Sequence, residues 1–107
     1  MREVDLSTFA TALADGALVL DVREPMEYVA GHVPGARLVP MGHLPGQLSD
    51  LPKDAPIYLI CASGNRSLSM AGFLIRAGYD AWSVAGGTGA WAAAGHPVVR
   101  GPRENAA

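Results

Sequence analysis

The amino-acid sequence predicts an α/β fold in three layers, with a central, mostly parallel sheet flanked by helices. Two observations predict it: apolar runs alternate with helical segments along the chain, and short turns rich in Gly and Pro separate them. A chain of 107 residues, half of them hydrophobic, is large enough for one packed domain. We therefore expect a single domain over 1–107, with its core over about 4–100 and a flexible tail over 101–107.

The first predicted elements are a short helix and a buried strand. The helix covers 7–13, because Ser7 is a suitable N-cap and Gly16 follows the end of the helix. The strand covers 17–22, where an apolar run includes one acid, Asp21, near its end. A run of this kind is typical of a strand that is buried on both faces of a parallel sheet.

Three shorter elements are predicted next. A helix is expected over 24–30, where Pro25 fits the first turn. A brief strand is expected over 37–39. A weaker helix is expected over 44–51, where Pro45 again fits the first turn.

The second half of the chain repeats the alternation with clearer signals. The apolar run 57–60 predicts the strongest strand, and 81–84 predicts another. The segment 68–77 predicts a helix with a single charged residue, which we expect to be largely buried. A final helix is expected around 90–94.

Reactive side chains follow two of these strands, in the segments 21–23 and 61–67. In open α/β sheets the functional groups collect at the carboxyl ends of the strands. The second segment contains Cys61, placed where a buried strand stops and a helix is about to start. We therefore take this segment as the candidate site.

The residues that follow Cys61 favour its thiolate form. Gly64 and Asn65 can take unusual backbone angles, so that successive N–H groups turn inward around an anion. A helix that begins near Ser67 adds its positive end, and Arg66 adds a permanent cation. We expect the pKa of Cys61 to lie below its usual value. The alternative is that Cys61 is a small apolar residue at the end of a core strand.

Composition and charge exclude several classes of function. A net charge of −2 gives no basic surface for nucleic acid, and no apolar run is long enough to span a membrane. The first residues lack the profile of a secretory signal, so we expect a cytoplasmic protein. A single cysteine allows no internal disulfide, and His43 and His96 have no partners at metal-ligand spacing, so no metal site is expected.

Four segments resemble the motifs of single-domain rhodaneses, which are thiosulfate sulfurtransferases. Residues 61–67 read Cys-Ala-Ser-Gly-Asn-Arg-Ser, which is similar to the active-site loop of that family. Residues 21–24 resemble its Asp-x-Arg segment, and residues 31–36 resemble its Gly-His-Ile-Pro-Gly-Ala segment. Gly86-Gly87 with Trp91 resembles its closing motif. The order and spacing agree over almost the whole chain.

This resemblance implies a rhodanese-like domain and a sulfur-carrying nucleophile, Cys61. It implies that Asp21 and Arg23 brace the loop or contact the donor, and that no cofactor is required. The reaction would move sulfur from a small anionic donor such as thiosulfate to a thiol or cyanide, through a Cys61 persulfide. The residues whose backbone would hold the sulfur are Ala62, Ser63, Gly64, Asn65, Arg66 and Ser67.

The loop also differs from parts of the family. Some members carry an arginine directly after the cysteine, where this chain has Ala62. The site therefore has one cation fewer for a dianionic donor, and a persulfide delivered by another protein competes with thiosulfate as the donor. The loop lacks the Cys-Gly-Ser-Gly-Val-Thr form of mercaptopyruvate sulfurtransferases. Mercaptopyruvate therefore ranks below thiosulfate and a protein persulfide as the expected donor.

Two other functions remain open at this point. One is a cysteine phosphatase or arsenate reductase; the phosphatases have one more residue between their Cys and Arg than this chain has between Cys61 and Arg66. The shorter loop fits a single sulfur atom better than a tetrahedral phosphate. The other is a protein-to-protein sulfur carrier or regulatory binding module with little turnover of small molecules, whose partner would be a persulfide-donating or thiol-bearing protein.

Overall fold

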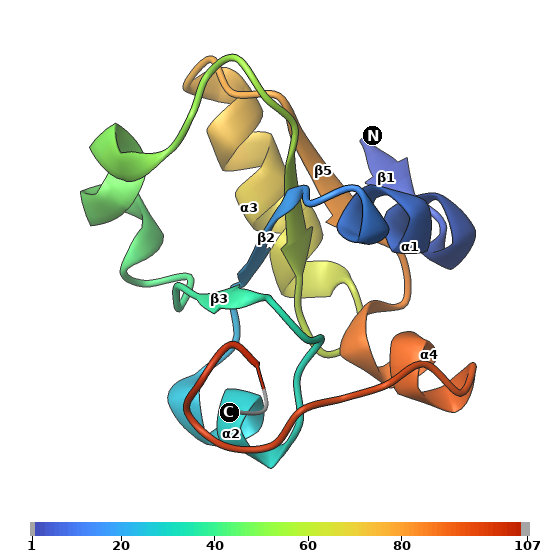
Figure 1. The fold of residues 1–107 in the computed structure, drawn as a ribbon. Helices are drawn as coiled ribbons and strands as arrows, with labels where there is room; N and C mark the ends of the chain where they lie inside the picture. The colour runs from blue at the N-terminus through green and yellow to red at the C-terminus, as the bar shows by residue number, and fades with distance from the viewer. Residues whose placement is uncertain (1, 106–107) are drawn as a thin grey trace.

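Five parallel strands form the central sheet of the computed structural model, which describes residues 2–105 (Figure 1). The order across the sheet is β1-β5-β4-β2-β3, so β4 lies in the middle with β2 and β5 beside it. The predicted α/β class is therefore confirmed. The strands are β1 (Glu3–Val4), β2 (Leu18–Asp21), β3 (Arg37–Leu38), β4 (Ile57–Ile60) and β5 (Ala81–Val84).

Helices cover both faces of this sheet and give two separate apolar clusters. The helices are α1 (Leu6–Ala14), α2 (Pro25–Ala30), α3 (Asn65–Arg76) and α4 (Gly87–Ala93), with a 3-10 helix, η1 (Leu44–Asp50). On one face, α3 and η1 pack on the sheet; on the other face, α1 and α4 do so (Figure 1). Because side chains alternate along a strand, Leu59 and Cys61 face the α3 cluster, whereas Ile60 faces the α1 and α4 cluster.

The strands β4 and β5 have the predicted bounds, and most differences concern helix ends and short elements. The cap of α1 is Asp5 and not Ser7: a carboxylate oxygen of Asp5 accepts a hydrogen bond of 2.8 Å from the backbone N–H of Thr8. The segment predicted as a helix over 44–51 is a 3-10 helix. The two-residue strand β1 has too short an apolar pattern to be predicted.

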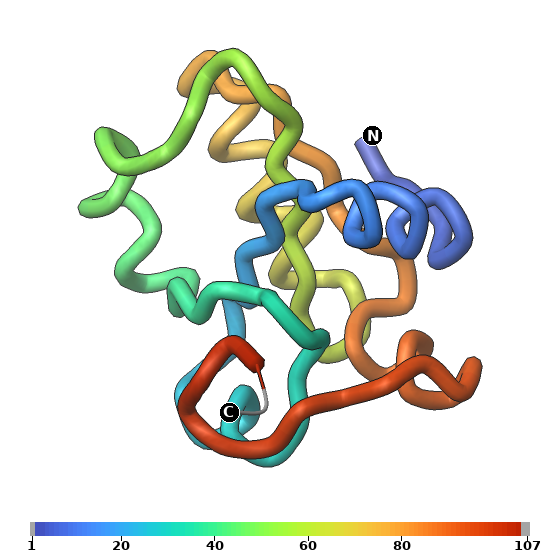
Figure 2. Tube along the Cα trace, viewed as in Figure 1, coloured from blue at the N-terminus to red at the C-terminus, as the bar shows by residue number. Residues whose placement is uncertain are grey.

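The C-terminal segment crosses from α4 to α2 and lies beside residues 31–36 (Figure 2). Val99 and His32 exchange two backbone hydrogen bonds, and the carbonyl of Glu104 accepts one from the N–H of Gly35. Residues 101–105 of the predicted flexible tail are therefore held against the domain, while 106 and 107 lie outside the described residues.

None of the helices described between residues 2 and 105 has the length and apolar character that crossing a membrane requires.

Candidate active site

Cys61 lies directly after the central strand β4, with its side chain buried and 1% exposed. Its Sγ accepts a hydrogen bond from the backbone N–H of Gly64 at 3.1 Å. The hydroxyl of Ser67 lies 3.4 Å from the same sulfur. Two hydrogen-bonding groups from the next six residues therefore meet at this sulfur atom.

These contacts favour a negative charge on the sulfur. Burial raises the pKa of the Cys61 thiol, because it penalises the charged form. Hydrogen bonds from the Ser67 side chain, and backbone N–H groups of Ser67, Gly64 and Ser63, lower the pKa by more than burial raises it. The net effect is a Cys61 pKa below its usual value, as the sequence predicts.

The helix after the loop begins earlier than expected. The segment predicted as a helix from Leu68 is already helical at Asn65, and Gly64 is its N-cap. Gly64 has a φ of 106°, a left-handed conformation that favours glycine, whereas Asn65 has ordinary helical backbone angles. The chain thus turns within three residues of Cys61, and the first turn of α3 supplies the groups around the sulfur.

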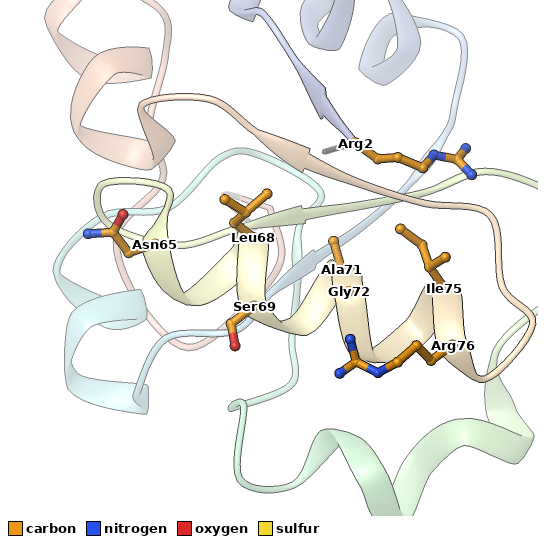
Figure 3. A pocket seen from close by; sticks show the side chains of 8 residues that line it. All are labelled: Arg2, Asn65, Leu68, Ser69, Ala71, Gly72, Ile75 and Arg76. Carbon is orange, nitrogen blue, oxygen red and sulfur yellow. The ribbon is translucent and has the colours of Figure 1, made fainter.

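Not every side chain of the predicted loop faces the sulfur. Ser63 and Asn65 have exposed side chains. Figure 3 shows Asn65 at one end of a groove along the outer side of α3, with Leu68 and Ser69 nearby and Arg2 at the far end. This groove is separate from the contacts of Cys61, and the backbone N–H groups that act on the sulfur are those of Ser63, Gly64 and Ser67.

The N-terminal turn of α4 holds the beginning of the loop from the other side. The backbone N–H of Thr88 donates to the carbonyl of Cys61 at 2.8 Å, and the N–H of Gly89 donates to the carbonyl of Ala62 at 3.0 Å. This approach depends on Gly87, because a Cβ there would lie 2.5 Å from the carbonyl oxygen of Cys61. The Gly86-Gly87 pair is thus a direct support of the loop.

Arg66 points toward α2 and forms an ion pair that the sequence does not predict. Its guanidinium donates two hydrogen bonds, of 2.7 and 2.8 Å, to the carboxylate of Glu27. This guanidinium holds the pKa of Glu27 at about 2, and Glu27 in turn raises the pKa of Arg66. The hydrogen bonds that lower the pKa of Cys61 come from the loop and α3 instead. The cation is at the predicted position in the loop, but its guanidinium is paired with a carboxylate from α2.

Asp21 and Arg23 form a second ion pair at the end of the neighbouring strand β2. Both oxygens of the Asp21 carboxylate accept hydrogen bonds from the Arg23 guanidinium, which also donates to the carbonyl of Gly31 at 2.8 Å. Asp21 is fully buried and Arg23 is 6% exposed. Within the described residues neither side chain hydrogen-bonds the 61–67 loop; the pair instead holds the carbonyl of Gly31, which follows α2.

Two partners of the site were missed because they come from distant segments. Glu27 lies 39 residues before Arg66, and Ser83, on β5, lies 16 residues after Ser67. The signal that could have found them is the order of the strands: β2 and β5 both lie beside β4. The helix that follows β2 and the end of β5 must then lie near the loop that follows β4.

Comparisons with known proteins agree with this arrangement. The family model of the rhodanese-like domain matches residues 5–94. A sulfurtransferase of Allochromatium vinosum is 35% identical over 102 residues, which cover 92% of this chain and 95% of that protein. The thiosulfate sulfurtransferase GlpE of Pseudomonas putida is 38% identical over 80 residues, which cover 74% of this chain and 73% of that protein.

A solved structure extends the agreement to the fold. The crystal structure of a rhodanese-related protein from Thermoplasma volcanium matches with a TM-score of 0.86 and 32% identity. The match covers 92% of this chain and 98% of that one. The chain therefore belongs to the rhodanese-like family and has its fold, and its single-domain relatives support sulfurtransferase activity in general.

Proposed function

We propose that this protein takes a sulfane sulfur from a donor such as thiosulfate onto Cys61 and passes it to a thiol or cyanide. One observation carries the proposal: the Cys61 sulfur lies among hydrogen-bond donors, and its pKa is lowered despite burial. A thiolate is the nucleophile in exchange at sulfur. We expect the acceptor to be a small thiol or a thiol-bearing protein, and the compartment to be the cytoplasm, where thiols stay reduced.

The reaction has two steps. In the first, the Cys61 thiolate attacks the outer sulfur of thiosulfate; a new S–S bond forms, and the S–S bond of thiosulfate breaks as sulfite leaves with its electron pair. In the second, an acceptor thiolate or cyanide attacks the outer sulfur of the persulfide, and Cys61 leaves as a thiolate. Neither step requires a metal or an organic cofactor.

Steady-state kinetics test this proposal against a carrier with little turnover. With thiosulfate as donor and cyanide or dithiothreitol as acceptor, we expect parallel lines in a double-reciprocal plot, because transfer through a covalent enzyme form gives ping-pong kinetics. Absence of turnover with every small acceptor, together with a stable persulfide on the protein, would support the carrier. Hydrolysis of a chromogenic aryl phosphate would support a phosphatase.

The pairing of Arg66 with Glu27 favours a second candidate, in which the physiological donor is a persulfide carried by another protein. Thiosulfate has two negative charges, and a persulfide has one. The two arginines that follow the ends of β2 and β4, Arg23 and Arg66, are both engaged with carboxylates. A dianion therefore gains less from this site than it would from an unpaired cation.

We expect Glu27→Gln to raise the preference for thiosulfate over the persulfide of 2-mercaptoethanol about fivefold. The two donors differ by one charge, and the attraction of one charge to a cation about 4 Å away is about 1 kcal/mol in water. The measurement is the ratio of kcat/KM for the two donors. Glu24→Gln is the matched control, because Glu24 is an exposed acid at the N-cap of the same helix and its side chain has no ion pair with Arg66. An unchanged ratio, or an equal rise in the control, would contradict this role of Glu27.

A further inference from the structure

The Ser67 hydroxyl, which contacts the Cys61 sulfur, is itself hydrogen-bonded to a second buried hydroxyl, that of Ser83. The Oγ of Ser67 has three polar neighbours: Cys61 Sγ at 3.4 Å, the carbonyl of Gly64 at 3.2 Å and the Oγ of Ser83 at 2.8 Å. Ser67 and Ser83 are both fully buried, on α3 and β5. The shortest of the three contacts thus joins two buried hydroxyls from different elements.

The number of protons decides the directions of these hydrogen bonds. Each hydroxyl has one proton to donate. Within the described residues, Ser67 Oγ is the single hydrogen-bond partner of Ser83 Oγ, so the Ser83 proton must point to Ser67 to be satisfied. The proton of Ser67 is then available for one of its other two neighbours, the Gly64 carbonyl or the Cys61 sulfur.

Moving the Ser67 proton from Gly64 to the sulfur leaves no buried group without a partner. The carbonyl of Gly64 also accepts a hydrogen bond of 3.1 Å from the backbone N–H of Leu68. It therefore stays satisfied when Ser67 turns toward Cys61. In the opposite direction, a neutral sulfur is a weak acceptor and loses little when Ser67 turns back.

We propose that Ser83 is a positioning residue for the sulfur chemistry, which holds the Ser67 hydroxyl so that its proton can move between Gly64 and Cys61. The inference rests on the proposed function. When Cys61 is a thiolate, Ser67 donates to it; when a persulfide forms, the charge moves to the outer sulfur and Ser67 returns to the Gly64 carbonyl. Ser83 donates to Ser67 in both states and strengthens it as a donor, because chained hydrogen bonds polarise one another.

The test is the pKa of Cys61 in reduced protein, measured from the ultraviolet absorbance of the thiolate against pH with no sulfur donor present. Since Cys61 is the only cysteine, the thiolate absorbance has one source. We expect Ser67→Ala to raise the pKa by about one unit, because a hydrogen bond to a charged group is lost. We expect Ser83→Ala to raise it by about half a unit. The double variant should match Ser67→Ala alone, because Ser83 acts through Ser67.

Two further variants separate positioning from packing. Ala81→Gly removes one buried heavy atom from the same face of β5, two residues before Ser83, and should leave the pKa unchanged. Ser83→Thr keeps the hydroxyl and suits a strand, so it should keep the pKa near that of the original protein. A pKa unchanged in Ser83→Ala, an equal rise in Ala81→Gly, or additive effects in the double variant would overturn the proposal. These results do not depend on sulfur transfer, so failure of the proposed function would be seen separately, as no sulfur uptake in the unaltered protein.

Discussion

Cys61→Ser is expected to abolish sulfur transfer while the fold is retained. A serine hydroxyl is not ionised near neutral pH and does not form the S–S bond that transfer requires. The two side chains are similar in size, and the N–H of Gly64 and the hydroxyl of Ser67 are in place to hydrogen-bond the new oxygen. We therefore expect the free energy of unfolding to change by only about 1 kcal/mol.

Intact mass spectrometry after mixing with thiosulfate measures this effect directly. The unaltered protein should gain one sulfur atom, and dithiothreitol should remove it. Cys61→Ser should gain none, and circular dichroism should show the same fold. Because the chain has a single cysteine, no other thiol can take over. Sulfur uptake by Cys61→Ser that dithiothreitol reverses would refute the role of Cys61.

The parts of the fold that the sequence predicts well are those with strong local patterns. The strand over 57–60 is an apolar run and the strand over 81–84 is mostly apolar; both lie inside the sheet, and their bounds agree with the structure. The strand β1 has only two residues, too few to show the alternation of apolar and polar residues that predicts a strand. It is a strand because it pairs in parallel with β5. The sequence likewise does not predict that η1 is a 3-10 helix rather than an α-helix, because Pro45 fits the first turn of either kind.

The candidate site likewise combines residues that are close in the sequence with residues that come from distant segments. Cys61 and the hydrogen-bonding groups around its sulfur lie within one segment of seven residues, 61–67, so that segment alone predicts them. The early start of α3 was missed because Gly64, unlike Ser or Asp, offers no side-chain oxygen as a capping signal. Glu27 and Ser83 act across the sheet, and only the strand order places them beside the loop.

Gly87→Ala is expected to destabilise the protein by about 3 kcal/mol and to disturb the Cys61 loop. The new Cβ would lie 2.5 Å from the carbonyl oxygen of Cys61 and 2.7 Å from the carbonyl carbon of Ala62. Both are backbone atoms, which cannot turn aside as a flexible side chain does. The φ of 60° at Gly87 adds the strain of a left-handed conformation, about 1 kcal/mol.

The matched control is Gly95→Ala, which has the same conformational strain without the collision. Gly95 has a φ of 87°, and a Cβ there would meet no atom within 4 Å. Urea denaturation should show a loss of about 1 kcal/mol for Gly95→Ala and about 3 kcal/mol for Gly87→Ala. The Cys61 pKa should rise in Gly87→Ala alone, because the N–H groups around the sulfur are displaced with the loop. Equal losses of stability in the two variants, with an unaltered Cys61 pKa, would show that the loop does not depend on the close approach of α4.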